Sequence, residues 1–207
     1  MIRSWLFLLA LTTAFSSSIA APDVKTFAEK LSDSAKERTN HIVIYNGAYR
    51  KITYPNGDVP KMYGVCTDVI IRSYRKLGID LQKNVHQDML LAFDSYPNFW
   101  GLKKPDSNID HRRVPNLQAY FTRHGISLKV SNKPKEYKTG DIVSWMLDGK
   151  LPHIGIVVDS RSSDGKRPMI VHNIGWGPKM EDMLFDFPIT GHYRYQAPLI
   201  MTQGSTE

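Results

Sequence analysis

The order of its hydrophobic patterns is the feature that most constrains how this chain can fold. Up to about residue 125, apolar residues recur at the three- and four-residue spacing of helices, whereas beyond it they alternate with a period of two. Helices followed by strands favour an α+β protein, with the helices packed on a C-terminal antiparallel sheet. Residues 21–207 suit one domain with its own core, and no linker or repeat divides them.

Four stretches carry the helical spacing. They are residues 22–40, residues 65–77 before Gly78, a helix from about Asn84, which would cap it, and "VPNLQAYFTRHG" ending at Gly125. The run "HIVIY" is predicted to be extended. Residues 46–64 and 95–113 are rich in Pro, Asn and Asp and are predicted to be loops, and a loop as long as the second is often functional.

Five stretches alternate as strands do: "ISLKV", "DIVSWML", "HIGIVVD", "MIVHNIG" and "HYRYQ". The third and fourth are joined by "SRSSDGKRP", which predicts a hairpin. His153 opens the third strand and His172 lies in the fourth, so the hairpin brings both to one end of the sheet. Strand parity leaves open whether His172 or Asn173 points toward His153.

The first twenty residues have the pattern of a secretory signal peptide. Arg3 is followed by an apolar run over residues 5–15 and by small residues up to Ala20. The run is too short to span a bilayer. We therefore expect a soluble protein exported to the bacterial periplasm, with no stable membrane anchor after cleavage; a cytosolic protein with an N-terminal anchor is the weaker alternative.

The chain is basic, with a formal net charge of +7. Such a charge favours association with peptidoglycan or another anionic envelope polymer, although it also serves solubility alone. No nucleic-acid-binding motif is present and export argues against that partner, so none is expected. The sequence does not set the oligomeric state, and we expect a monomer.

Cys66 is the only cysteine, and it falls at the predicted start of a helix. In an exported protein, a thiol that cannot pair within the chain is a buried inert group, an intermolecular disulfide partner or a reactive group. Helix starts favour the thiolate through their free N–H groups and dipole. Cys66 is therefore a candidate nucleophile, with one of His153 and His172 as its base and the other, or Asn173, as the orienting residue.

The Cys-bearing helix, "GDIVSW", "HIGIVVD" and "IVHNIG" together resemble the NlpC/P60 superfamily of papain-like cysteine peptidases and amidases. The resemblance implies Cys66 as nucleophile, His153 as base and His172 as orienting residue. It also implies a tyrosine near the oxyanion site about a dozen residues before the cysteine, which matches Tyr54. Over nearly the whole predicted mature chain, "YPNGDVP", "GVCTDV", "NIDHRRVPNL" and "ITGHYR" more closely resemble the bacterial domain of unknown function 1287, which names no substrate.

Asp68 departs from the superfamily pattern, because a glycine usually stands there. We interpret Asp68 as a charge of the first helical turn or an ion-pair partner, and as a weaker candidate for the substrate site. The other weak candidates for the substrate site are Asp110, His111, Arg112, Arg113 and Trp176. The first four lie in "NIDHRR", which is predicted to be either a solvated loop or a cleft wall where an arginine holds a substrate carboxylate. Trp176 lies in "IGWGP" and can stack on substrate.

These patterns predict an exported cysteine hydrolase that cleaves an amide bond of peptidoglycan, within the stem peptide or between sugar and peptide. Two alternatives stay open, a catalytically inactive wall-binding module and an acyltransferase that passes the thioester to an amine or lipid. No cofactor is expected. No metal is expected either, because the candidate zinc ligands show no paired spacing: His111, His153, His172 and His192.

Overall fold

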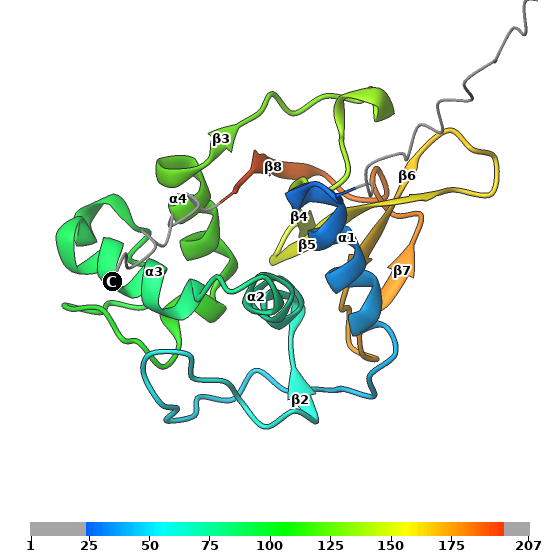
Figure 1. Ribbon diagram of the computed structural model, residues 1–207. Coiled ribbons are helices and arrows are strands. Elements are labelled where there is room, and N and C mark those ends of the chain that lie inside the picture. The colour runs from blue at the N-terminus through cyan, green and yellow to red at the C-terminus, as the bar shows by residue number, and fades with distance from the viewer. Residues whose placement is uncertain (1–23, 197–207) are drawn as a thin grey trace, which may run out of the picture.

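The computed structural model describes residues 24–196, which form four α-helices and eight strands (Figure 1). The helices are α1 (Phe27–Arg38), α2 (Cys66–Lys76), α3 (Leu81–Leu91) and α4 (Val114–His124). The predicted signal peptide, residues 1–20, lies outside the described residues. Within residues 24–196, no helix has the length and apolar character needed to cross a bilayer.

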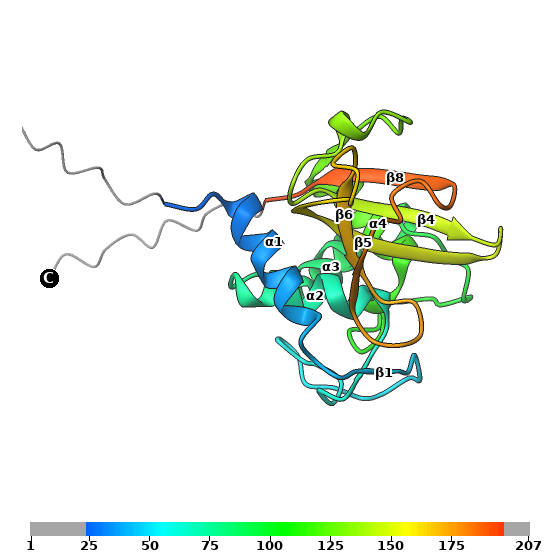
Figure 2. The same cartoon turned by 90° about the vertical axis from the view of Figure 1, so that its right-hand side faces the viewer.

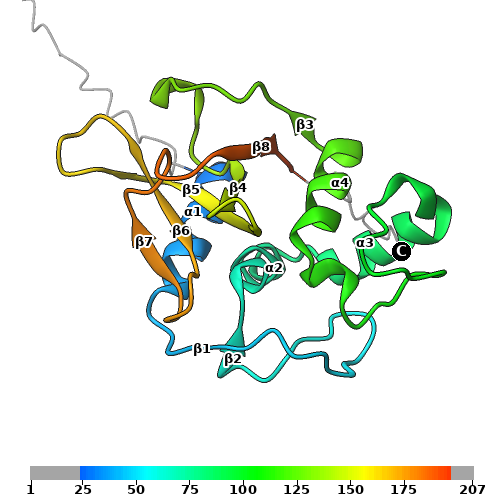
Figure 3. The ribbon, with the colours of Figure 1, turned by 180° about the vertical axis from the view of Figure 1, so that it is seen from behind.

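Six strands form one antiparallel sheet in the order β3-β8-β4-β5-β6-β7. Its members are β3 (Ile126–Ser127), β4 (Ile142–Leu147), β5 (Leu151–Arg161), β6 (Pro168–His172), β7 (Lys179–Glu181) and β8 (Ile189–Arg194). A separate parallel pair joins β1 (Ile44–Tyr45) to β2 (Tyr63–Gly64), which leads directly into α2 (Figure 3). Helices followed by an antiparallel sheet confirm the predicted α+β class.

The sheet has a different hydrophobic cluster on each face. On one face, Ile154, Ile156 and Val171 pack with apolar residues of α1, α2 and α4; Figure 2 shows α1 and α2 beside the strands. On the other face, Val157 and Trp145 pack with the segment before β8. Because side chains alternate along a strand, His153 and Gly155 share the face of Val157, opposite the helices; beyond Val157 the register shifts, and Asp159 bonds to Ser32 on α1.

Several local predictions needed correction. The helix expected from Asn84 begins at Leu81, because the Asp80 side chain accepts a hydrogen bond from the Lys83 N–H and caps it one turn earlier. Residues 46–64, predicted to be a loop, contain β2, and residues 95–113 contain a short 3₁₀ turn, Asp110–Arg112, after a second one that ends at Ser95. Strand β7 was not predicted, because its three residues are all exposed and show no alternation.

Candidate active site

Cys66 is the first residue of α2, and its sulfur lies beside the backbone of Ile154 on β5. Backbone N–H groups of Ile154 and Thr67 are directed at the sulfur. The N–H of Val157 bonds to the carbonyl of Asp141, the residue just before β4 (2.8 Å), so alternation turns the N–H of Ile154 toward β6. However, β6 ends at His172, opposite Gly155. The sulfur of Cys66 thus occupies the place where the next β6 residue would have accepted that hydrogen bond.

Burial decides the protonation state of Cys66. It raises the pKa of the thiol to about 12, and the charge of Asp68 raises it further, against the smaller lowering effect of the N–H groups. The helix start was expected to favour the thiolate, but desolvation outweighs it. With its sulfur buried in this way, Cys66 is therefore a neutral thiol at neutral pH.

His153 and His172 form a buried chain with Glu181. Nε2 of His153 lies 3.1 Å from Nδ1 of His172, and Nε2 of His172 lies 2.8 Å from a carboxylate oxygen of Glu181. Both imidazoles are buried, whereas the Glu181 side chain is 47% exposed. The predicted pairing of the two histidines is confirmed. Glu181 was missed, because it lies on the strand that carried no sequence signal.

The chain of contacts fixes which nitrogen can take a proton. Burial lowers the pKa of His153 to about 3, and burial also lowers the pKa of His172 despite the opposing effect of Glu181, so both rings are neutral. A carboxylate only accepts, so Nε2 of His172 carries hydrogen and Nδ1 does not. His153 must then donate from Nε2. Its Nδ1 is left unprotonated and free to act as a base.

Gly155 allows the two histidines to meet. It lies on β5 opposite His172 of β6, and a Cβ atom there would come within 2.7 Å of Ile170 Cγ2 and 3.1 Å of the His172 Cβ. A side chain at this position would push β6 away from β5.

The substitution Gly155→Ala is accordingly expected to lower the free energy of unfolding by about 1–3 kcal/mol, because the added methyl group overpacks the space between the strands. Urea denaturation measures this loss. Gly47→Ala is the matched control, since its added Cβ meets one side-chain atom at an ordinary 3.6 Å, and we expect a change within about 0.5 kcal/mol. Equal effects of the two substitutions would contradict the argument.

Asn173 does not reach the histidine pair. It is buried, and neither atom of its amide has a hydrogen-bond partner among the described residues. It lines a small cavity beside Val65 and Asp68. Of the two residues considered for the third position, His172 is the one that contacts His153.

The tyrosine beside the thiol is Tyr45 rather than Tyr54. Tyr54 packs its ring edge-on against His86 of α3, with centroids 5.0 Å apart. Tyr45 lies within hydrogen-bonding reach of the Cys66 sulfur, and burial together with that sulfur raises the pKa of Tyr45 to about 12. Pairing of β1 with β2 places Tyr45 opposite Gly64, two residues before Cys66. The sequence held no signal for this pairing beyond the extended run "HIVIY".

Asp68 and Arg112 form a buried ion pair, so neither is available to substrate. One carboxylate oxygen of Asp68 accepts the N–H of Val65 at 2.6 Å, and both oxygens accept from the Arg112 guanidinium at 2.9 Å. The side chains are 3% and 2% exposed. This confirms Asp68 as an ion-pair partner at the helix start and corrects Arg112, whose role as a substrate clamp is wrong.

The remaining weak candidates lie in different settings. Asp110 and His111 are buried, so "NIDHRR" is neither a solvated loop nor a cleft wall at those positions. Burial raises the pKa of Asp110 and lowers the pKa of His111 to about 3. Arg113 bonds to Asp110 and lies 3.9 Å above the Trp100 ring. Trp176 is 88% exposed and is free to contact a ligand.

The four histidines weighed as zinc ligands do not converge. His153 and His172 meet, but His192 bonds to Asp141 at 2.8 Å and stacks on Tyr137, and His111 lies in a 3₁₀ turn before α4. Between residues 24 and 196, no three His, Cys, Asp or Glu side chains gather as a metal site requires.

The raised pKa predicts an unreactive thiol. At pH 8, we expect iodoacetamide to alkylate Cys66 on the order of 10³-fold more slowly than the urea-unfolded chain, because a thiol that titrates near 12 is almost wholly protonated. The rate should still rise about tenfold per unit up to pH 10, whereas a thiol of ordinary pKa levels off above about 8.5. A plateau reached below pH 8 would instead indicate a thiolate–imidazolium pair.

Together, fold and site define an α+β protein with one buried thiol at a helix start and a histidine–histidine–glutamate chain on the antiparallel sheet; within residues 24–196 no hydrogen bond joins the thiol to either histidine. The domain of unknown function DUF1287 matches residues 32–195, so the chain belongs to this family, as its motifs suggested. The chain is similar to the "Uncharacterized protein YijF" of Escherichia coli (strain K12). The two are 47% identical over 202 residues, which cover 93% of this chain and 98% of that protein.

Proposed function

We propose that this protein is an exported cysteine hydrolase of NlpC/P60 type, in which Cys66 is the nucleophile, His153 the base and His172 the orienting residue. The observation that carries the proposal is the chain from Glu181 through His172 to His153, which leaves Nδ1 of His153 unprotonated. The N–H of Ile154, the residue that follows His153, is directed at the Cys66 sulfur. Helix α2 thus supplies the nucleophile and β5 the base. Strand β6 supplies the orienting histidine, and β7 supplies the carboxylate that accepts its hydrogen bond.

The reaction requires Nδ1 of His153 to approach the Cys66 thiol, because no hydrogen bond joins the two among the described residues. His153 Nδ1 takes the proton of the Cys66 thiol as the sulfur attacks an amide carbonyl carbon, which gives a tetrahedral intermediate. N–H groups at the start of α2 and the hydroxyl of Tyr45 stabilise its oxyanion. Collapse expels the amine, protonated by His153, and leaves a thioester on Cys66. Water, deprotonated by His153, then attacks the thioester and releases the acid and the thiol.

Peptidoglycan is the substrate that the rest of the chain favours. The signal-peptide pattern directs the protein to the envelope, and the net charge of +7 complements the carboxylates of that polymer. Because the sulfur is buried, substrate binding must be coupled to a local opening of the site. Desolvation no longer opposes the thiolate once the site opens, and the pKa of the thiol falls accordingly.

A wall-binding module without turnover is the second candidate, and the buried neutral thiol favours it. With the pKa of Cys66 near 12 and the pKa of His153 near 3, the closed site holds no thiolate. Such a protein would bind peptidoglycan without cleaving it, and binding would survive loss of the thiol.

Digestion of purified peptidoglycan by residues 21–207 tests the proposal, with the products identified by mass spectrometry. We expect new amine and carboxyl ends with the native sequence and none with His153→Ala. His124→Ala, which removes a histidine that is 40% exposed and paired with Asp88 on α3, is the matched control and should cleave normally. Binding without cleavage by the native protein would support the second candidate and reject the first.

A further inference from the structure

A basic hollow of about 300 Å³ lies where α1 and α2 end. Its lining comes from the last turn of α1 and the residues that follow, from α2, and from the loop before β2: Arg38, His41, Asp58, Lys61, Arg72, Arg75 and Lys76. Asp58 is the one carboxylate in this lining. We refer to these seven residues as the basic hollow.

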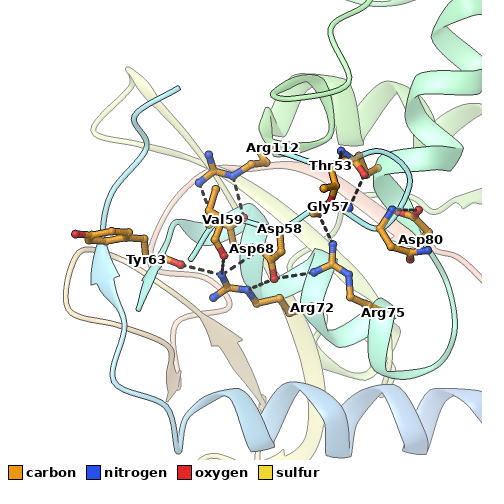
Figure 4. A network of polar contacts seen from close by, with 12 residues as sticks. Thr53, Gly57, Asp58, Val59, Tyr63, Asp68, Arg72, Arg75, Asp80 and Arg112 are labelled. Carbon is orange, nitrogen blue, oxygen red and sulfur yellow. Dashed lines mark hydrogen bonds and ion pairs between the residues drawn. The ribbon is translucent and has the colours of Figure 1, made fainter. Parts of the chain in front are cut away.

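The cations of the basic hollow exceed their internal partners. Asp58 accepts from both Arg72 and Arg75, as Figure 4 shows. Lys76 is paired with Glu37 on α1. Within residues 24–196, the side chains of Arg38 and Lys61 make no ion pair or hydrogen bond. Two positive charges are therefore left without a counterion at this place.

Support of the helix ends explains only part of this cluster. Cations in the last turn of a helix offset its dipole, and Arg38 and Arg75 hold such positions. However, burial and the charge of Arg72 lower the pKa of Arg38. The charge of Arg38, followed by burial and the charges of Arg72 and Lys61, lowers the pKa of His41, which Glu37 approaches only to 3.9 Å. The positive field thus extends beyond what the helix ends require.

We propose that the basic hollow binds a phosphate group, with Arg38 and Lys61 as the ligands that the fold leaves unpaired; Arg72, which is bonded to Asp58, adds only its charge to the positive field. The cations approach from three chain segments, α1, α2 and the loop before β2. A phosphate presents oxygens in several directions, whereas a carboxylate presents two in one plane, so the phosphate matches the arrangement better. The hollow is also large enough for a phosphate ester.

The proposed site is separate from the thiol. Arg72, the nearest residue of the hollow on α2, lies six residues after Cys66, which corresponds to roughly 9 Å along the helix axis. Arg38 and Arg72 also line the small cavity beside Val65, but that cavity does not include the thiol. Neither the thiol nor the histidine pair lines the hollow. The inference therefore does not depend on the proposed hydrolase function, and either can fail without the other.

Calorimetric titration of residues 21–207 with inorganic phosphate at low ionic strength tests the inference. We expect saturable binding that Arg38→Ala weakens by roughly 10- to 100-fold, because a charge-assisted pair of hydrogen bonds is lost. Arg38 is unpaired, so the variant should fold normally. Arg161→Ala is the matched control; it removes an exposed arginine outside the hollow and should change the affinity less than twofold.

A second readout is the imidazole of His41, followed by NMR. Bound phosphate should raise the pKa of His41, because it offsets the charges of Arg38, Arg72 and Lys61. No saturation by about 10 mM phosphate, equal affinity for acetate, or equal effects of Arg38→Ala and Arg161→Ala would overturn the proposal. Glycerol phosphate and vesicles of phosphatidylglycerol then distinguish a soluble ester from a lipid headgroup, and Arg38-dependent binding of either one supports it.

Discussion

Replacing Cys66 with alanine is expected to abolish hydrolysis of peptidoglycan amides, lowering kcat/KM by at least about 10³-fold. In the proposed mechanism the sulfur forms the covalent intermediate, so the variant has no nucleophile for His153 to activate. The measurement is the rate of product formation from purified peptidoglycan.

The Cys66→Ala variant is well suited to this comparison because the change is small. It removes one buried sulfur atom and leaves the contacts of Asp68 and Arg112 in place. Thermal unfolding should therefore show a folded protein, and binding to peptidoglycan should persist. Hydrolysis that continues at the native rate would exclude Cys66 as the nucleophile.

The Asp68→Asn substitution is expected to lower the free energy of unfolding by about 3–5 kcal/mol. Asparagine can still accept the N–H of Val65, so the change chiefly removes the charge that neutralises Arg112. An arginine left buried without a counterion is strongly destabilising. Urea denaturation gives the loss.

Two comparisons make this stability prediction specific. Asp182→Asn removes the partner of Arg167 in a more exposed pair and should cost about 1 kcal/mol or less. Arg112→Met should cost less in the Asp68→Asn background than in the native protein, because the unpaired charge is then already present. A loss for Asp68→Asn as small as that for Asp182→Asn would mean that solvent reaches the Arg112 guanidinium.

The reach of the sequence differs between local and long-range features. The start of α2 at Cys66 and the hairpin of β5 and β6 were predictable, because each depends on residues that are close along the chain. From them followed the pairing of His153 with His172. By contrast, Glu181 and Tyr45 belong to three- and two-residue strands with no repeat for a pattern to reveal.

The "NIDHRR" segment shows why a polar run can mislead. Its charges predicted a solvated loop or a substrate site, yet Asp110 and Arg112 are buried, the first accepting from Arg113 and the second paired with Asp68. The partner of Arg112 lies 44 residues earlier. In the sequence, a charged residue that has a buried partner looks the same as an exposed one. Only the tertiary structure, which brings the residue and its partner together, distinguishes the two cases.

The sequence by itself determined the fold class, the position of the thiol at a helix start and the strands that carry the two histidines. These features follow from hydrophobic periods and helix-stop signals, which act over a few residues. The tertiary structure alone decided that Tyr45 and Glu181 join the site, that Asp68 neutralises Arg112 and that the thiol is protonated. Those outcomes depend on packing between distant segments and on the exclusion of water, and desolvation is a property of the assembled core rather than of any short stretch of sequence.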